Sequence, residues 1–135
     1  MTDGLAGRLR AFTGPDGGDL LDLPEAPRPG EEPQAPPRVL PEYDNLLLSY
    51  AGRSRVIPHR RPVPLPPGNG ASAGTLLVDG FWQADWKITR GRDRSVLDIW
   101  PFTQLGGSHD AIAAEGLRLF EFAAPAATYD VRFAC

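Results

Sequence analysis

The stretch TLLVDGFWQADWKIT, residues 75–89, contains the clearest fold signal of the chain. Its dipeptide Asp79-Gly80 is typical of two-residue hairpin turns, because both residue types tolerate the positive φ angles that such turns need. After the turn, apolar residues alternate with polar ones. The apolar members are Trp82, Ala84, Trp86 and Ile88. Since the side chains of a strand point alternately to opposite faces, the pattern predicts a hairpin whose second strand turns one apolar face toward a core.

The segments that follow extend this hairpin into a small domain. GRDR, residues 91–94, predicts a turn into the strand SVLDIWPF, 95–102, which gives a three-stranded antiparallel meander. Ser108 predicts the N-cap of a helix that runs to Ala123, and TYDVRF, 128–133, predicts a final strand. The apolar stripe of this helix would contain Ile112, Gly116, Leu119 and Ala123, widened by Ala113, Leu117 and Phe120. We therefore expect an α+β fold, in which one helix covers a small curved antiparallel β-sheet that forms a partial barrel.

The first part of the chain differs in composition from the rest. Residues 8–13 and 19–23 flank the turn sequence GPDGG, which predicts a β-hairpin within residues 1–23. Seven prolines between positions 24 and 41 predict an extended linker over residues 24–38, followed by a β-rich domain over 39–135. Pro41 predicts the start of a short helix through Tyr50, although LLLSY also suits a strand.

The charges are distributed unevenly along the 135 residues. The net charge is -3, but residues 38–94 carry nine basic and five acidic groups and so have a net charge of +4. The segments on either side are acidic. The middle segment is thus the part of the chain that could bind a polyanion, and its modest charge predicts weak binding.

Other function classes are not indicated by the composition. Cys135 is the single cysteine, and His59 and His109 lie far apart, so we expect neither a disulfide nor a metal site, and no cofactor. No apolar run reaches the roughly 18 residues of a membrane span, and a signal-peptide core is absent, so we expect a cytoplasmic protein without a membrane partner. Heavy use of Ala, Gly, Pro and Arg suggests a GC-rich bacterial genome.

Several segments resemble one protein family. The main one is LPEYDNLLLSYAGRSRVIP, 40–58, and the others are DLLDLPEAPRP at 19–29, LLVDGFWQADWKI at 76–88, EGLRLFEFAA at 115–124 and YDVRF at 129–133. They resemble the C-terminal third of the bacterial winged-helix DNA-binding proteins that include the AlkZ-type DNA glycosylases, which remove bulky alkylated bases and cross-links. The resemblance implies that the hairpin of residues 1–23 is a wing ending a winged-helix unit. It also implies that the C-terminal region closes one end of a basic duplex-binding surface. Residues 58–74 depart from the basic segment usual there.

Two basic clusters are candidates for contact with DNA phosphates. The first contains Arg53, Arg55, His59, Arg60 and Arg61. The second, at the predicted turn of residues 91–94, contains Arg90, Arg92 and Arg94. Arginine donates in a fork that fits phosphate oxygens, and each neutralised phosphate releases counterions. The structural alternative is a solvated surface, with Arg53 and Arg55 paired to Glu42 or Asp44.

Other polar and aromatic residues favour structural roles. Gln83-Ala84-Asp85 matches the Gln-x-Asp form of the family's catalytic signature, but that signature lies in the N-terminal part of family members. We expect Gln83 and Asp85 to be solvated strand residues. Asp44 and Asn45 are expected to cap a helix. The aromatic residues Tyr43, Trp82, Trp86 and Trp100 are expected in the core. His109 is expected to be a helix-start residue without catalytic partners.

Three hypotheses about function follow. The first is a DNA-binding accessory domain that contacts the backbone of double-stranded DNA weakly and without sequence preference, and that is not an enzyme by itself. The second is the C-terminal part of a DNA glycosylase, active only with an N-terminal winged-helix part encoded upstream or as a separate partner. The third is a protein-interaction module without nucleic-acid binding, using the proline-rich residues 58–67 or a sheet edge.

Overall fold

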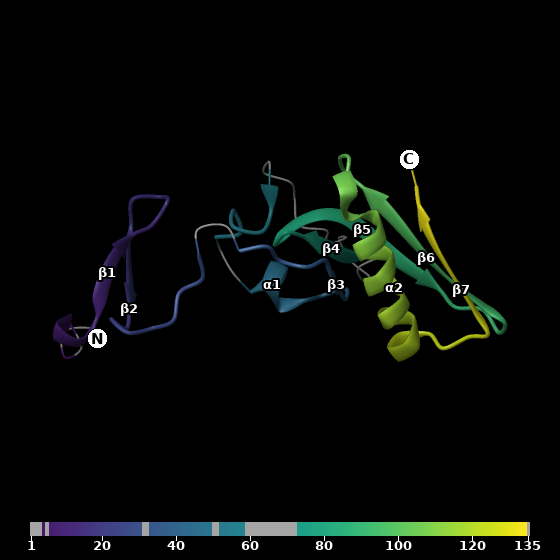
Figure 1. The fold of residues 1–135 in the computed structure, drawn as a ribbon, viewed down its shortest axis with the longest axis horizontal. Coiled ribbons are helices and arrows are strands. Elements are labelled where there is room, and N and C mark those ends of the chain that lie inside the picture. Colours follow the sequence, from purple (N-terminus) through teal and green to yellow (C-terminus); the bar gives the residue numbers. More distant parts are fainter. Residues whose placement is uncertain (1–3, 5, 31–32, 50–51, 59–72, 135) are drawn as a thin grey trace. The chain divides into compact units, whose positions relative to one another are not determined.

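The computed structural model describes residues 4, 6–30, 33–49, 52–58 and 73–134 (Figure 1). The chain divides into two compact units, residues 1–33 and residues 34–135. Each unit has its own sheet, of two and five strands respectively. The second unit contains the larger core, so most of the fold is decided there.

The first unit is the predicted β-hairpin. After a 3₁₀ turn, Ala6–Arg8, strand β1 (Arg10–Thr13) pairs antiparallel with β2 (Asp19–Asp22). Arg28, which follows the hairpin in sequence, contacts both of its strands. Its guanidinium lies 4.7 Å from the ring centroid of Phe12 and 3.3 Å from the Asp22 carboxylate. Leu21 and Leu23 nevertheless stay more than half exposed. A two-stranded hairpin is marginally stable alone, and Arg28 supplies part of what it lacks.

The second unit contains a five-stranded sheet in the order β3-β4-β5-β6-β7. Its strands are β3 (Arg38–Leu40), β4 (Gly74–Val78), β5 (Phe81–Thr89), β6 (Arg94–Pro101) and β7 (Thr128–Phe133). Asp79 and Gly80 connect β4 to β5 with φ angles of 51° and 79°, as a two-residue turn of the predicted kind requires. The predicted meander of β4, β5 and β6 is confirmed.

The direction of the last strand corrects the expectation of an antiparallel sheet. Strand β7 runs parallel to β6, with Arg94 opposite Thr128 and Ile99 opposite Phe133. Between them, helix α2 (His109–Ala123) crosses one face of the sheet and returns the chain to the starting end of β6 (Figure 1). A strand that follows such a crossover must run parallel to the strand before it. The sheet is thus mixed, and the pairing order, which ends at β3 and β7, does not close it into a barrel.

A β-bulge divides the apolar face that the sequence predicts for β5. Leu76 lies opposite Ala84, but Leu77 lies opposite Trp82, so Gln83 is an extra residue of β5. An offset of one residue reverses the face that the following side chains use. Trp82 accordingly leaves the core under α2 and joins a second cluster. That second cluster contains Leu47, Ile57, Leu77 and Trp82. The core under α2 contains Leu76, Ala84, Trp86, Leu97, Ile99, Leu105, Ile112, Phe120 and Ala124.

Helix α2 approaches the sheet closely at a glycine. A Cβ atom on Gly116 would lie 2.8 Å from a methyl carbon of Leu97, so a larger residue would force the Leu97 side chain or the helix to shift. Ile112 and Phe120 are buried on the same face, as predicted. Leu117 is 47% exposed, so its predicted place in the apolar stripe is wrong. Ser108 precedes α2 but its side chain makes no cap hydrogen bond.

The short helix before the sheet is α1 (Asn45–Leu48), which is shorter than the predicted 41–50. Asp44 begins it, because its carboxylate accepts a hydrogen bond from the backbone N–H of Leu46 at 2.9 Å. The predicted capping role of Asp44 is thereby confirmed. Leu47 is buried in the second cluster, so α1 covers the part of the sheet around Trp82.

Candidate nucleic-acid interface

The turn between β5 and β6 is fixed to the connection between α2 and β7. Arg90 donates from Nε to the carbonyl oxygen of Ala123 at 3.1 Å. Thr128 donates from its backbone N–H and from Oγ1 to the carbonyl oxygen of Asp93, each at 3.0 Å. A Cβ atom on Gly91 would lie 2.3 Å from the carbonyl oxygen of Arg94, so a side chain at Gly91 cannot fit. The basic turn predicted from the sequence is therefore a well-anchored one.

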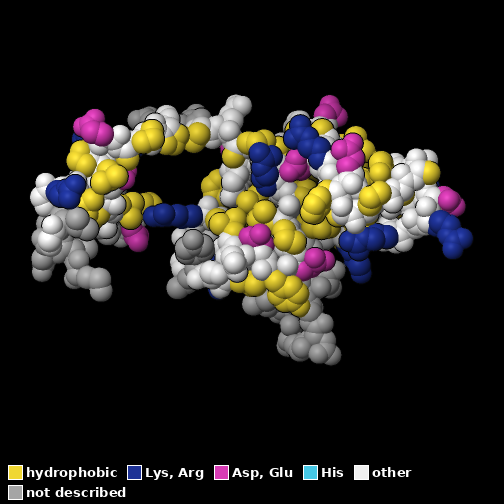
Figure 2. Space-filling model, turned by 90° about the horizontal axis from the view of Figure 1, so that it is seen from below, with side chains coloured by type: hydrophobic (Ala, Val, Ile, Leu, Met, Phe, Trp, Pro, Cys, Tyr) yellow, Lys and Arg dark blue, Asp and Glu magenta, His cyan; other side chains and the backbone are white. Residues whose placement is uncertain are grey.

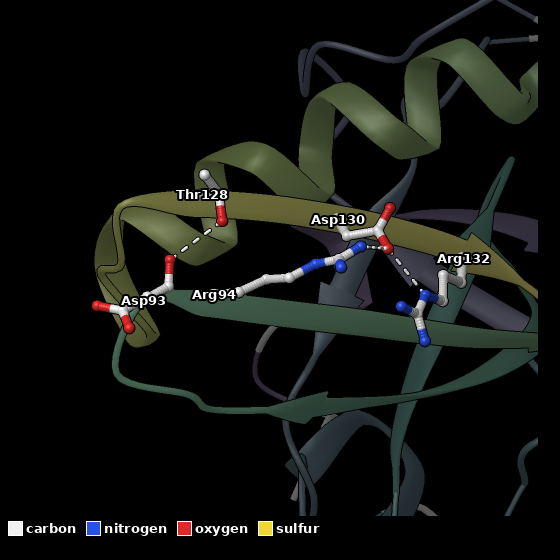
Figure 3. Close-up of polar contacts among 5 residues, drawn as sticks. All are labelled: Asp93, Arg94, Thr128, Asp130 and Arg132. Carbon is white, nitrogen blue, oxygen red and sulfur yellow. Dashed lines mark hydrogen bonds and ion pairs between the residues drawn. The ribbon is translucent and has the colours of Figure 1, made fainter.

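Arg94 belongs to a charged group that sequence reasoning missed. The carboxylate of Asp130 accepts hydrogen bonds from Arg94 Nη2 at 2.5 Å and from Arg132 Nε at 2.8 Å. Figure 3 shows the two guanidinium groups reaching the same carboxylate from β6 and from farther along β7. The hydrogen bond from Arg132 is the main reason why the pKa of Asp130 is lowered; the loss of hydration opposes this, and Arg94 adds to it. One carboxylate shared by two arginines leaves an excess of positive charge.

Arg92 is the exposed member of the second cluster that has no partner among the described residues. It lies in the exposed turn between β5 and β6, and it forms no hydrogen bond or ion pair with another described residue. Asp93 lies directly beside it, and Figure 2 shows basic and acidic side chains together at the end of the sheet that carries this turn. The turn thus exposes the guanidinium of Arg92 to solvent, with the Asp93 carboxylate next to it in sequence.

The first basic cluster likewise contains one hydrogen-bonded arginine and one exposed arginine. Arg53 donates from Nη2 to the carbonyl oxygen of Leu48, the last residue of α1, at 3.2 Å. The carbonyl oxygen of Arg53 in turn accepts from the backbone N–H groups of Val56 and Ile57. Arg55 lies exposed on the turn so formed. The remaining members, His59, Arg60 and Arg61, lie outside the described residues.

The pairing suggested for this cluster is not found in the described part of the chain. Arg53 contacts a backbone carbonyl instead of Glu42 or Asp44, and the Asp44 carboxylate caps α1. Arg53 therefore supports the end of the helix whose start Asp44 supports, which is a structural role.

Gln83 and Asp85 lie at the bulge of β5 with structural partners. Gln83 Oε1 accepts from the Thr103 hydroxyl at 3.3 Å, and Asp85 accepts from Trp82 Nε1 at 3.2 Å. Both side chains are half-buried, so they are less solvated than predicted. Their contacts hold the bulge and the start of the segment after β6, which agrees with a structural role for this triplet.

The predicted burial of the aromatic residues holds for two of four. Trp82 and Trp86 are 2% and 7% exposed, and Trp86 Nε1 donates to the carbonyl oxygens of Leu40 and Thr75. Tyr43 and Trp100 are 55% and 39% exposed, so their predicted burial is wrong. Trp100 follows the buried Ile99 on β6 and therefore points to the opposite face of the sheet.

An open crevice lies at the ends of β6 and β7, beside the start of α2. Its volume is about 530 Å³, and its walls include Phe102, His109 and Phe133. His109 Nδ1 lies 3.1 Å from the carbonyl oxygen of Gly106, and its ring meets that of Phe133 edge-on. His109 is the one titratable residue among the described walls, so they do not provide a pair of groups for acid–base catalysis.

Two kinds of feature are absent from the described residues. They contain no group of three or more His, Cys, Asp or Glu side chains that could hold a metal ion. Among the same residues, no helix is long and apolar enough to span a membrane.

Comparisons with known proteins agree with the segment resemblances. The DNA glycosylase AlkZ-like family matches residues 2–122. Among solved structures, the DNA glycosylase AlkZ of Streptomyces sahachiroi is similar in fold, with a TM-score of 0.57 at 18% sequence identity. The match covers 97% of this chain and 35% of the AlkZ chain. No curated protein matches the chain. The family match extends over most of the sequence, and the chain belongs to the AlkZ-like DNA glycosylase family.

Proposed function

We propose that this chain is a DNA-binding accessory region of a DNA-repair protein. The region contacts the duplex backbone and does not excise bases by itself. The observation that carries the proposal is the anchored β5–β6 turn, from which Arg92 extends into solvent. Membership of a DNA glycosylase family supports DNA as the partner. A turn fixed by Arg90 and Thr128 could present a guanidinium to a phosphate with little loss of conformational freedom on binding.

The contacts would be few and independent of base sequence. Arg55 and Arg92 are the exposed arginines that we propose as contacts. Arg53 and Arg90 already donate hydrogen bonds to backbone carbonyls. His59, Arg60 and Arg61 remain proposed contacts by their sequence alone. A guanidinium grips phosphate oxygens without reading bases, so affinity should be at non-specific strength, about 10⁻⁴–10⁻⁶ M near physiological salt. The acidic residues elsewhere in the chain oppose tighter binding.

Arg94 would contribute indirectly. Its guanidinium and that of Arg132 share the Asp130 carboxylate, so the three side chains together carry one net positive charge on the strands next to the turn. This charge would attract a phosphate backbone over a distance of about a Debye length, roughly 8 Å at physiological ionic strength. We assign Arg94 to this electrostatic role because its guanidinium is held by the Asp130 carboxylate within the protein.

Base excision would belong to a longer assembly. The chain spans 35% of the length of the AlkZ chain that it matches, and its described residues do not bring together an evident nucleophile, base or metal site. We therefore keep as the second candidate a C-terminal part of a glycosylase that is active only with an N-terminal winged-helix part. The β1–β2 hairpin would then be the wing that ends that part.

The test is fluorescence anisotropy with two unrelated duplexes over a range of salt concentrations. Arg55→Ala and Arg92→Ala should each weaken binding equally on both duplexes and lower the log–log salt slope by about one unit. Arg8→Ala removes the same charge from the first unit and is the matched control. No binding by the wild-type chain at low salt would overturn the proposal and move the protein-interaction hypothesis to first place. Equal losses in all three variants would show that binding depends on total charge instead of the two turns.

A further inference from the structure

Phe122 is the most unusual surface residue in the described part of the chain. Its side chain is 90% exposed, although α2 buries Ile112, Gly116 and Phe120 on its other side. The next most exposed large apolar residue in this helix is Leu117, at 47%. Burying a phenylalanine side chain is favourable, so full exposure of one on an ordered helix favours a role in binding.

Several arginines lie near Phe122. Its neighbour Ala123 accepts the hydrogen bond from Arg90. The β5–β6 turn (residues 90–93), called the arginine turn below, therefore lies beside the same end of α2. Arg118, one helical turn before Phe122, is 77% exposed and shares the Glu115 carboxylate with Arg38. The charged neighbours also include Glu121 and Asp93, so three acidic groups (with Glu115) stand against four arginines, Arg38, Arg90, Arg92 and Arg118, and leave a net charge of +1. This end of the unit thus combines one exposed aromatic ring with several guanidinium groups.

We propose that Phe122 stacks on an unpaired base of the DNA whose backbone the arginine turn contacts. This inference rests on the proposed DNA-binding function and adds a preference to it. A polyanion with flat apolar rings fits the combination of guanidinium groups and an exposed aromatic ring, because phosphates bind the former and every base has a face that can stack on the latter. Single-ring stacking tolerates any base, so no sequence preference arises.

The preferred DNA would contain a base outside the normal stack. In an intact duplex both faces of each base are covered by its neighbours, and opening the stack costs free energy. A bulged base, or a base opposite a gap, already exposes a face. The preference would therefore be for a local defect in the duplex, whatever its chemical origin, while the arginine contacts stay the same on intact and defective DNA.

The experiment compares two duplexes of identical sequence, one fully paired and one with a single bulged 2-aminopurine. We expect the wild-type chain to bind the bulged duplex more tightly and to change the 2-aminopurine fluorescence. Phe122→Ala and Phe122→Leu should each reduce affinity for the bulged duplex by about five-fold or more and abolish the fluorescence change. Phe122→Trp, which keeps an aromatic ring, should preserve both. None of the three should alter affinity for the paired duplex, and their melting temperatures should match the wild type because the side chain is exposed.

The outcomes separate this inference from the proposed function. Equal binding of both duplexes by the wild type, or an unchanged preference in Phe122→Ala, would overturn the stacking role and leave backbone binding intact. Loss of self-association in Phe122→Ala, without any change in the preference, would assign the ring to a second copy of the chain and would equally overturn it. If the wild type binds neither duplex, the proposed function itself fails and the inference fails with it.

Discussion

The side chain of Arg90 donates from Nε to the carbonyl oxygen of Ala123, the last residue of α2, at 3.1 Å. The last carbonyl groups of a helix lack partners within it, and a basic side chain is a favourable partner there because of both the hydrogen bond and the helix dipole. This contact joins the β5–β6 turn to the far end of the crossover helix. It gives one arginine of the turn a structural role, whereas Arg92, two residues later, is exposed to solvent.

Arg90→Ala should lower the free energy of unfolding by about 1 kcal/mol, because a charge-assisted hydrogen bond and a helix C-cap are lost. Arg92→Ala removes the same side chain from the exposed turn and should change stability by no more than about 0.5 kcal/mol. Urea denaturation of both variants measures the difference. Equal destabilisation would mean that the contact with Ala123 contributes nothing.

Trp86→Ala should destabilise the protein by about 3–5 kcal/mol, which is enough to unfold a marginal domain. Trp86 is buried under α2 and its indole N–H donates to the carbonyl oxygens of Leu40 and Thr75. Trp100→Ala is the matched control, since Trp100 is 39% exposed and should cost far less. Thermal melts followed by circular dichroism compare the two, and a near-neutral Trp86 variant would contradict the described core.

Gly74→Ala should be destabilising, since the added Cβ would lie 2.4 Å from the indole ring of Trp86. The ring cannot move away without breaking its hydrogen bonds, so we expect a cost of about 1–3 kcal/mol from overpacking. Gly107→Ala serves as the control, because a Cβ there meets no atom within 4 Å. Chemical denaturation of the two variants would show similar midpoints if the ring did not cover Gly74.

The ion pairs of Asp130 should make stability depend on pH in the acidic range. Its pKa is lower in the folded protein than its ordinary value of 3.8, so the contribution is fully present above that value and is lost as pH falls through the folded pKa. The stability difference between wild type and Asp130→Asn should therefore shrink below about pH 4. Arg132→Ala and Arg94→Ala should each weaken this pH dependence, because both guanidinium groups donate a hydrogen bond to the carboxylate and attract its charge. A difference that stays constant from pH 2 to pH 7 would contradict the assignment.

The isolated chain should release no base from alkylated duplex DNA under single-turnover conditions. Gln83 and Asp85 have partners within the protein, in Thr103 and Trp82, and the bulge that they support lies on a strand of the sheet. Base release that disappears in Gln83→Ala would show that the triplet acts on substrate. Adding the N-terminal part of a glycosylase of the same family tests the second candidate function, which predicts that activity then appears.

Local signals in the sequence were sufficient for the individual elements. The turn at Asp79-Gly80, the strands around it and the α2 helix follow from patterns within a few residues, because turn conformation and side-chain periodicity depend on near neighbours. Membership of the AlkZ-like family was also visible in short segments of the sequence. The two arginine clusters could be named in advance, but not which of their members would be engaged.

The tertiary structure alone decided how these elements combine. The parallel pairing of β6 and β7 depends on the path of α2 across the sheet, and the bulge at Gln83 moves Trp82 into a second cluster. Arg90 and Ala123 are 33 residues apart, and Arg94 and Asp130 are 36 apart. Contacts at such separations depend on the route of the whole chain. The sequence by itself thus determined the helices and strands, the family and the positions of the charged residues along the chain. The fold determined which of these charges face solvent, because only packing brings a distant carbonyl or carboxylate within hydrogen-bonding distance of a given arginine.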